Sequence, residues 1–423
     1  MIFNRYIAVF LLFAAIFCTT CTKVEVSPVS NPSASAIKVY GNQFGNFLGT
    51  FEATADGGYV FGGYTIGSAA LQQQGFIQKC DGNGNLEWYQ TYGGSKQDLF
   101  WVVHPTSDGG YIAAGATTSY GLGTSTNNQS AYLVKTDAHG LLLWQKAYGG
   151  ANGALFYDVT ETPDQGFVAV GSQAGKFYVV KTDQNGNSLW SHGWNVNDPS
   201  FGASVVIGPD SEIAVAGIFL QYINLYNYHP TFSYLTENGD FIVLDNSVDH
   251  NHNVLGYSFN SSAINNSLSV PPSINVTSPL SCEKIIRRPD GFIWVYNCIG
   301  FTNIELFKTD FAGNLQWYKS YKGNGGTVYF SDASNSPNGG LLISGGTTSP
   351  NLSDPYYCWL LNTDSSGNKL MESFIPMPEN AWAAGAVFSG NSIAIGTNLT
   401  TPSNIHANYF GFLLTDQNGN IKK

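Results

Sequence analysis

Short runs of alternating hydrophobic and polar residues recur along the chain, and each run follows a turn sequence. The stretches "YVFGGYT" (59–65) and "YIAAGAT" (111–117), for example, both follow Asp-Gly-Gly. Asp-Gly between two apolar runs is a hairpin signal, because glycine tolerates the positive φ of a tight turn. The corresponding stretches read "ADGGYVFGGYT", "SDGGYIAAGATT", "PDQGFVAVGSQ", "PDSEIAVAGIF", "PDGFIWVYNC", "PNGGLLISGGTT" and "SGNSIAIGTN". The pattern predicts a series of β-hairpins.

A second turn, typified by "KTDAHGLLLWQKAYGG" at 135–150, ends each unit. In six of the seven units an Asp lies three residues before the turn glycine, and a large apolar residue usually lies four residues after it. The turn glycines are Gly84, Gly140, Gly186, Gly239, Gly313, Gly367 and Gly419. The residues four positions later are Trp88, Trp144, Trp190, Val243, Trp317, Met371 and Lys423. The average step is about 56 residues, which indicates a repeat architecture over almost the whole chain.

Each unit reads as four strands: a strand, the Asp-Gly turn, a second strand, a variable loop, a third strand, the Asp-x-x-Gly turn and a fourth strand. Four short antiparallel strands repeated seven times are typical of a β-propeller. We therefore expect an all-β fold, a seven-bladed propeller over residues 37–423, with an insertion at about 245–281. The insertion is rich in Asn and Ser and is expected to be an exposed loop.

The ends of the chain also carry a signal. "AIKVYGN" (36–42) matches the second half of the fourth strand of a unit, as in "WQKAYGG", and the final unit stops at its own Trp position. We predict that Lys38–Tyr40 supplies the outer strand of the last blade and closes the ring.

The Asp/Gly/Trp motif resembles the tryptophan-docking repeat of bacterial quinoprotein-like propellers, and also propeller repeats of bacterial surface proteins. The resemblance implies turn-forming Asp and Gly and a Trp wedged between blades. Quinoprotein dehydrogenases carry eight units, neighbouring cysteines and a metal-bound cofactor, and the sequence shows none of these, so no cofactor is expected. Sialidase propellers clamp a carboxylate with three arginines, whereas only Arg287 and Arg288 follow the N-terminal Arg5.

The N-terminus resembles a bacterial lipoprotein signal. Arg5 precedes the apolar run Ile7–Phe17, which is too short to span a bilayer. Cys21 follows two small residues and is the candidate for lipidation, which makes residues 1–20 the signal peptide and 21–36 a Ser/Pro-rich tether. The expected location is the bacterial cell envelope, lipid-anchored, at the outer membrane. Plain secretory cleavage is the alternative.

The remaining cysteines have no metal-ligand spacing. Cys282 and Cys298 flank the turn "RRPDG" and are a disulfide candidate for an oxidising compartment, while Cys80 and Cys358 read as buried thiols. His250 and His252 form a His-x-His pair in the insertion, interpreted as solvated loop residues, so no metal is expected. The net charge of −11 argues against a nucleic-acid partner.

Of 19 Asp residues, eleven fall in the two repeated turns, where Asp caps backbone N–H groups of its own turn. Ligands of propellers usually bind where the first strands of the units converge, so the candidate site comes from aligning those strands. The resulting candidates are Trp101, Tyr157, Asp158, Glu283, Lys284, Asp332 and Trp382. Aromatic and charged side chains of this kind suit stacking on sugars or gripping a peptide; blade packing with local ion pairs is the alternative.

Three functions remain open from the sequence. The first is a non-catalytic, monomeric envelope lipoprotein that binds a glycan or a protein partner through the propeller face. The second is a carbohydrate-active enzyme, with Asp158 and Asp332 as a carboxylate pair. The third is a structural subunit of an outer-membrane assembly.

Overall fold

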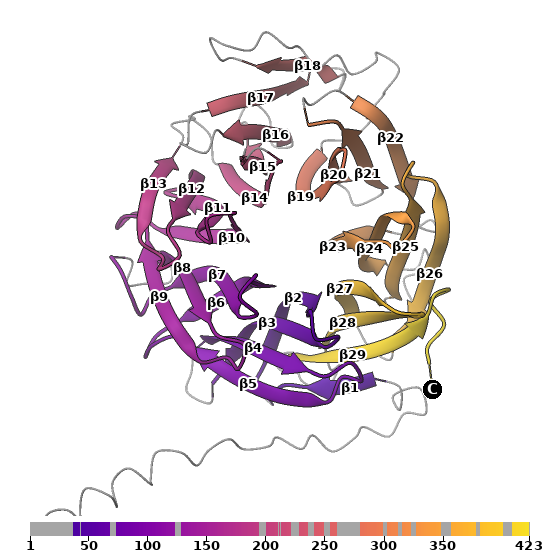
Figure 1. Cartoon of the computed structure of the whole chain (residues 1–423), viewed down its shortest axis with the longest axis horizontal. Coiled ribbons are helices and arrows are strands. Elements are labelled where there is room, and N and C mark those ends of the chain that lie inside the picture. The colour runs from indigo at the N-terminus through magenta and orange to yellow at the C-terminus, as the bar shows by residue number, and fades with distance from the viewer. Residues whose placement is uncertain are drawn as a thin grey trace, which may run out of the picture.

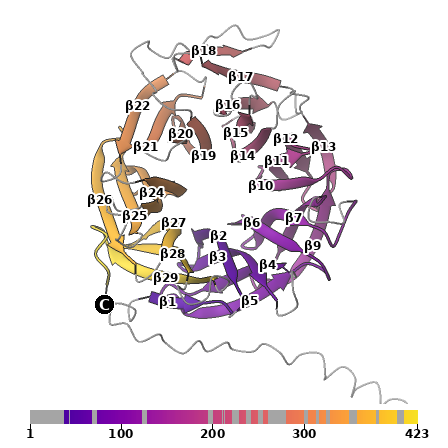
Figure 2. The same cartoon turned by 180° about the vertical axis from the view of Figure 1, so that it is seen from behind.

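The structure is a computed structural model that describes residues 37–42, 44–67, 73–122, 128–193, 200–209, 211, 213–220, 228–235, 241–248, 254–259, 280–298, 303–311, 315–322, 327–347, 357–377, 381–400 and 408–422. These residues form an all-β propeller whose antiparallel sheets follow one another around a ring, as both faces show (Figures 1 and 2). Neighbouring sheets meet through their inner strands, in the order β2, β6, β10, β14, β19, β23, β27 and back to β2. Within the described part of the chain, no helix is long and apolar enough to cross a membrane.

Six of the sheets have four strands. Three of these four-stranded blades come first in the chain: β2 (Asn46–Ala53), β3 (Tyr59–Ile66), β4 (Gln73–Cys80), β5 (Leu86–Tyr92); β6 (Asp98–Pro105), β7 (Tyr111–Thr117), β8 (Ser130–Thr136), β9 (Leu142–Tyr148); β10 (Ala154–Glu161), β11 (Phe167–Gln173), β12 (Lys176–Thr182), β13 (Ser188–Gly193). The other three are β19 (Leu280–Arg288), β20 (Gly291–Cys298), β21 (Asn303–Thr309), β22 (Leu315–Lys322); β23 (Val328–Asn335), β24 (Gly339–Thr347), β25 (Tyr357–Asp364), β26 (Lys369–Pro376); and β27 (Ala381–Ser389), β28 (Ser392–Thr400), β29 (Asn408–Asp416) with β1 (Ile37–Tyr40).

A further sheet, between β13 and β19, has five strands and corrects the sequence prediction of seven four-stranded blades. It comprises β14 (Ser200–Ile207), β15 (Ile213–Leu220), β16 (Tyr228–Leu235), β17 (Phe241–Val248) and β18 (Val254–Phe259). The fifth strand comes from the predicted insertion, which folds back so that Val254 pairs with Val248 and Phe259 with Leu244. The segment 245–281 is therefore not entirely a loop, because Val254–Phe259 forms a strand that extends the sheet. His250 and His252 lie outside the described residues.

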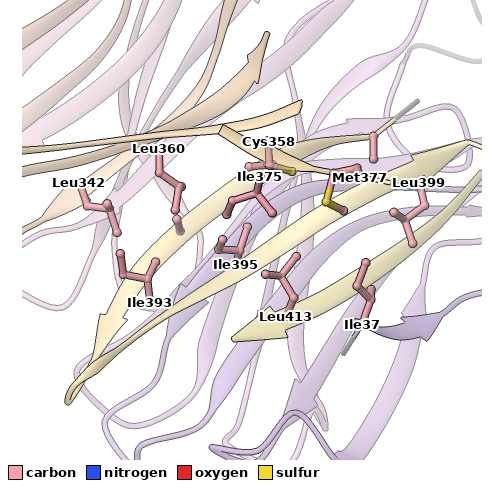
Figure 3. Close-up of a cluster of buried hydrophobic side chains, with 13 residues drawn as sticks. Ile37, Leu342, Cys358, Leu360, Ile375, Met377, Ile393, Ile395, Leu399 and Leu413 are labelled. Carbon is pink, nitrogen blue, oxygen red and sulfur yellow. The ribbon is translucent and has the colours of Figure 1, made fainter. Parts of the chain in front are cut away.

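The N-terminal strand completes the C-terminal sheet. In β1, Ile37 pairs with Leu413 and Tyr40 with Phe410 of β29, so β1 takes the place of the fourth strand in this unit. The side chain of Ile37 is buried against Leu399 and Leu413 in the hydrophobic cluster of this sheet and its neighbour (Figure 3). Tyr40 packs on Phe410 of the same sheet and on Phe61 of the first blade, with ring centroids 5.5 and 5.6 Å away.

The Asp-x-x-Gly turn has the structural role that the sequence predicts. In the second blade, Oδ1 of Asp137 accepts hydrogen bonds from the backbone N–H groups of His139 and Leu141, at 2.9 and 2.8 Å. The same pair of bonds recurs at Asp81, Asp183, Asp364 and Asp416. These carboxylates are occupied by their own turns.

In several blades, the fourth strand packs against the Asp-x-x-Gly turn of the following blade. The ring of Trp144 lies against Gly186, where a Cβ would approach it to 2.7 Å and where φ is +73°, so only glycine fits. Tyr148, from the "YGG" of the same strand, donates its hydroxyl to the carbonyl of Gly186 at 2.7 Å. The equivalent hydroxyl bonds join Tyr92 to Gly140, Tyr321 to Gly367 and, across the ring closure, Tyr40 to Gly84. The repeated Trp and Tyr therefore hold neighbouring blades together.

A buried lysine, not recognised in the sequence, ties the two repeated turns of a blade to each other. Lys181 is only 4% exposed, yet its Nζ lies 2.8 Å from both carboxylate oxygens of Asp164 in the Asp-Gly turn. Equivalent pairs are Lys79–Asp56, Lys135–Asp108 and Lys308–Asp290. The sheet β23–β26 has Asn362 and Asn338 at these two positions. In this sheet both members of the pair are therefore replaced.

This pairing predicts an asymmetry between two substitutions. Asp164→Ala leaves the buried ammonium of Lys181 with only Thr162 and the carbonyl of Thr182, and should lower the free energy of unfolding by about 2–3 kcal/mol. Lys181→Met leaves a half-exposed carboxylate that water can solvate, and should cost about 1 kcal/mol or less. Urea unfolding of both variants and of the double variant tests this. Equal losses in the two single variants would contradict it.

Candidate functional site

A β-bulge interrupts the inner strand of every sheet at an equivalent position. The bulged residues are Gly49, Trp101, Tyr157, Ala203, Glu283, Ser331 and Ala384. A bulge adds one residue to one strand and re-aims its side chain, and bulges are frequent next to functional sites. For six sheets, the bulge coincides with the first ring of candidate positions aligned from the sequence.

The alignment is wrong for the last sheet, where the bulge lies at Ala384, two residues beyond the predicted Trp382. Trp382 instead occupies the position two residues before the bulge, which is equivalent to Phe47, Leu99, Leu155 and Tyr329. All of these side chains are at least partly exposed. The last unit has no Asp-Gly turn, since Ser389 pairs directly with Ser392, so the turn that fixed the alignment in other units was missing here.

An aromatic group forms along the inner strands of the first three blades. Trp101 packs edge-on against Phe47 and Tyr64 of the preceding blade, with centroid distances of 5.9 and 6.3 Å, and is tilted against Tyr157 of the following blade at 6.1 Å. Phe47 and Tyr64 are stacked at 5.2 Å. We call Phe47, Tyr64, Trp101 and Tyr157 the aromatic group. The indole Nε1 of Trp101 is buried and has no hydrogen-bond partner among the described residues.

The aromatic group lies nearer the variable-loop end of the propeller. The first strand of each unit begins at that end and runs towards the Asp-Gly turn, so residues at and before the bulge precede the repeated turns. The loops at the start of the first strand and after the second strand differ in length and sequence between units. Binding residues are found disproportionately in variable loops that a rigid scaffold positions.

Beyond the bulge, towards the Asp-Gly turns, the inner strands carry a charged cluster. His104 of β6 lies between two carboxylates: its Nδ1 is 2.6 Å from Oε1 of Glu52 on β2, and its Nε2 is 3.0 Å from Oδ1 of Asp158 on β10. Lys284 of β19 pairs with Asp332 of β23. The five side chains come from five different sheets. We call Glu52, His104, Asp158, Lys284 and Asp332 the charged cluster.

The charged forms of these groups stabilise one another. Burial acts to lower the pKa of His104, but Glu52 and Asp158 outweigh it and raise the pKa to about 10, so the imidazole is protonated at neutral pH. Burial acts to raise the pKa of Glu52, but His104 and Lys284 hold it below its usual range. Burial likewise opposes the charge of Lys284, whose pKa is nevertheless raised by Asp332 and Glu52. Asp332 is the exception, because burial outweighs its pairing with Lys284 and raises its pKa above the usual range.

Asp158 also holds the next sheet in place. Its Oδ2 accepts hydrogen bonds from the hydroxyl of Ser204 and the backbone N–H of Val205, both at 2.9 Å. Thr50 has the equivalent role one position after its own bulge, accepting from the N–H of Val103 at 3.1 Å. Residues at this position therefore bridge neighbouring sheets just after the bulge, and both oxygens of Asp158 are already engaged.

The structure brings the predicted site residues together in two layers. Trp101 and Tyr157 lie in the aromatic group, and Asp158, Lys284 and Asp332 lie in the charged cluster. Glu283 is half-buried at the bulge of β19, and Trp382 lies on the last sheet. Sequence reasoning missed Glu52 and His104, which align with each other three residues after the bulge. Their opposite charges at the same aligned position could have indicated an ion pair between neighbouring blades.

The cysteines divide into two pairs. Cys80 and Cys358 are buried free thiols, as expected. Cys282 lies on β19 and Cys298 on β20, where the register pairs them with Tyr296 and Leu280, but their side chains lie outside the described residues. No group of three or more His, Cys, Asp or Glu side chains in the described ranges is arranged to hold a metal ion.

Comparisons with known proteins show likeness in fold alone. No protein-family model matches the chain, and no curated protein sequence matches it. A puromycin hydrolase S511A mutant complexed with PGG is 12% identical with a TM-score of 0.52; the match covers 89% of this chain and 53% of that one, so this chain spans about half its length. The β-propeller domain of the Trilobed protease from Pyrococcus furiosus is 9% identical, with a TM-score of 0.44 and coverage of 89% and 96%. YCF48 bound to D1 peptide is 9% identical, with a TM-score of 0.47 and coverage of 92% and 98%.

Proposed function

We propose that this chain is a non-catalytic lipoprotein of the bacterial cell envelope, lipidated at Cys21, that binds a glycan or a protein partner through the aromatic group. The five-stranded sheet serves as the seventh blade of its ring. The observation that carries the binding proposal is the aromatic group itself. Trp101 and Tyr157 are half-buried at consecutive bulges, away from the repeated turns, and their side chains remain partly exposed although they pack against one another across neighbouring blades.

The chemistry of the aromatic group suits an uncharged, partly apolar ligand. Aromatic faces that are only half-buried offer apolar area to a sugar ring or to a peptide side chain at a low cost in side-chain entropy. An unpartnered buried donor such as Trp101 Nε1 costs free energy, and such groups in native structures often mark function.

The contacts of Asp158 favour binding over hydrolysis. A general acid or nucleophile needs a carboxylate oxygen directed at the substrate. Both oxygens of Asp158 instead accept hydrogen bonds from the protein, and Asp332 is paired with Lys284. Glycoside hydrolysis that is lost in Asp158→Asn at unchanged thermal stability would favour the enzyme instead.

The test is binding of the full chain to an array of glycans and to an array of peptides. Trp101→Ala should weaken binding of the selected ligand by at least about tenfold, since tryptophans at the centre of interfaces contribute most of the affinity. Trp144→Ala is the matched control, because it removes a half-buried indole at the opposite, repeated-turn end. Equal weakening in both variants, or none in Trp101→Ala, would refute the proposal. Copurification with envelope proteins that neither variant affects would indicate a structural subunit.

A further inference from the structure

Exposed leucines are concentrated at the repeated-turn end of the propeller. Of the ten large hydrophobic side chains exposed among the described residues, six lie within three positions after an Asp-x-x-Gly turn. They are Leu86, Leu141, Leu142, Leu143, Leu189 and Leu370, between 41% and 67% exposed. We call these six residues the leucine row.

The leucine row lies at one level of the ring. Its members are the first or second residue of the outer strands β5, β9, β13 and β26 or, for Leu141, immediately precede one of them, and these strands belong to four different sheets. Residues one to three positions after the same turn of repeated units around a ring lie at one end of the molecule. A set distributed in this way can contact a flat surface together, whereas a single compact partner would cover only one or two blades.

The chain enters the propeller at this same end. β1 is antiparallel to β29, and Ile37 pairs with Leu413, closer to the turn at Asp416 than Tyr40, which pairs with Phe410. β1 therefore begins at this end, and it also contacts the turn that precedes Leu86, through Lys38 and Asn85 at 2.7 Å and through Tyr40 and Gly84. Residues 1–36, with the apolar run Ile7–Phe17 and Cys21, join the propeller beside the leucine row.

We propose that the leucine row rests on a lipid bilayer, so that the repeated turns face the membrane and the aromatic group faces away from it. The proposal rests on the N-terminal lipid anchor of the proposed function for attachment, and on the leucine row for orientation. Half-exposed leucines gain free energy by entering the interfacial region of a bilayer. A net charge of −11 provides no overall attraction to anionic lipid, so the contact in this proposal is apolar.

The second blade offers a matched pair of probe sites. Leu141 and Leu122 are both 67% exposed in the same blade, but Leu141 follows the Asp-x-x-Gly turn, whereas Leu122 lies in the loop after the second strand, at the opposite end. Leu141→Cys and Leu122→Cys are each labelled with an environment-sensitive fluorophore in the full acylated chain. The parent chain, carried through the same labelling, gives the background from its own cysteines.

The labelled proteins are anchored on phosphatidylcholine vesicles whose acyl chains carry a nitroxide quencher. The label at position 141 should be quenched several-fold more than the label at 122, and 1 M salt should not abolish the difference. Equal quenching at both sites, greater quenching at 122, or none at either would overturn the proposal. So would a fluorescence shift at 141 that depends on protein concentration without vesicles, which would indicate a second copy. Array binding that depends on Trp101 is independent of these outcomes, so the two proposals fail separately.

Discussion

Deleting residues 36–42 should lower the free energy of unfolding by about 5 kcal/mol or more, a large fraction of the stability of an ordinary domain. The deletion removes the strand that completes the C-terminal sheet, exposes the hydrophobic cluster around Ile37, and removes Tyr40 from between the first and last blades. A terminal segment with no such contacts costs little when it is removed. Thermal unfolding followed by circular dichroism measures the effect.

Two single substitutions in β1 test whether the stability comes from side-chain packing and not simply from the presence of the segment. Ile37→Ala should cost about 2–4 kcal/mol, because the side chain is 9% exposed and leaves a cavity beside Leu413. Val39→Ala is the control, since its side chain is 41% exposed, and should cost less than about 1 kcal/mol. If the deletion and Ile37→Ala are both as stable as the parent chain, β1 does not close the ring.

The protonated His104 should make stability fall with rising pH. Its pKa is about 10 in the folded protein, above its unfolded value of about 6.5, so the folded state holds a proton that the unfolded state releases. The stabilisation is fully present below about pH 6.5 and is lost as pH rises through 10. Between pH 6.5 and 9 we expect the free energy of unfolding to fall by about 2–3 kcal/mol.

His104→Gln keeps a polar side chain without a titrating proton and should remove most of this pH dependence. His139→Gln is the control, because His139 is exposed in the turn of the second blade. Urea unfolding of the three proteins at pH 6.5, 8 and 9 measures the difference. A parent chain whose stability is as pH-independent as that of His104→Gln would contradict the ion pairs with Glu52 and Asp158.

The repeated residues made most of the fold predictable from the sequence. Asp137 and its equivalents accept hydrogen bonds from backbone N–H groups of their own turn, which is a local interaction. Trp144 packs against the glycine of the next turn, which is part of the same repeated motif. The closing strand was predicted because residues 36–42 match the fourth strand of a unit and the final unit lacks one. The fifth strand, β18, was not predictable in this way, because a segment that occurs once has no counterpart to align with.

The site was predictable only in part, because it depends on contacts between units. Trp101 and Asp158 were found from aligned positions, but Trp382 was misplaced because the last unit lacks the Asp-Gly turn that aligns the others. The partners of His104 come from the sheets on either side. The buried Lys181 was missed because a lysine in a strand reads as exposed until its partner across the blade is known. Ion pairs of this kind arise from tertiary packing.

The central claim is that function resides where the units differ and not in the turns they share. Hydrogen exchange of the full chain, with and without the ligand selected by the array, tests this most directly. We predict that the ligand slows exchange at the starts of β6 and β10, around Trp101 and Tyr157, and leaves the turns at 137–140 and 183–186 unchanged. Protection confined to those turns, with none at β6 and β10, would contradict the account.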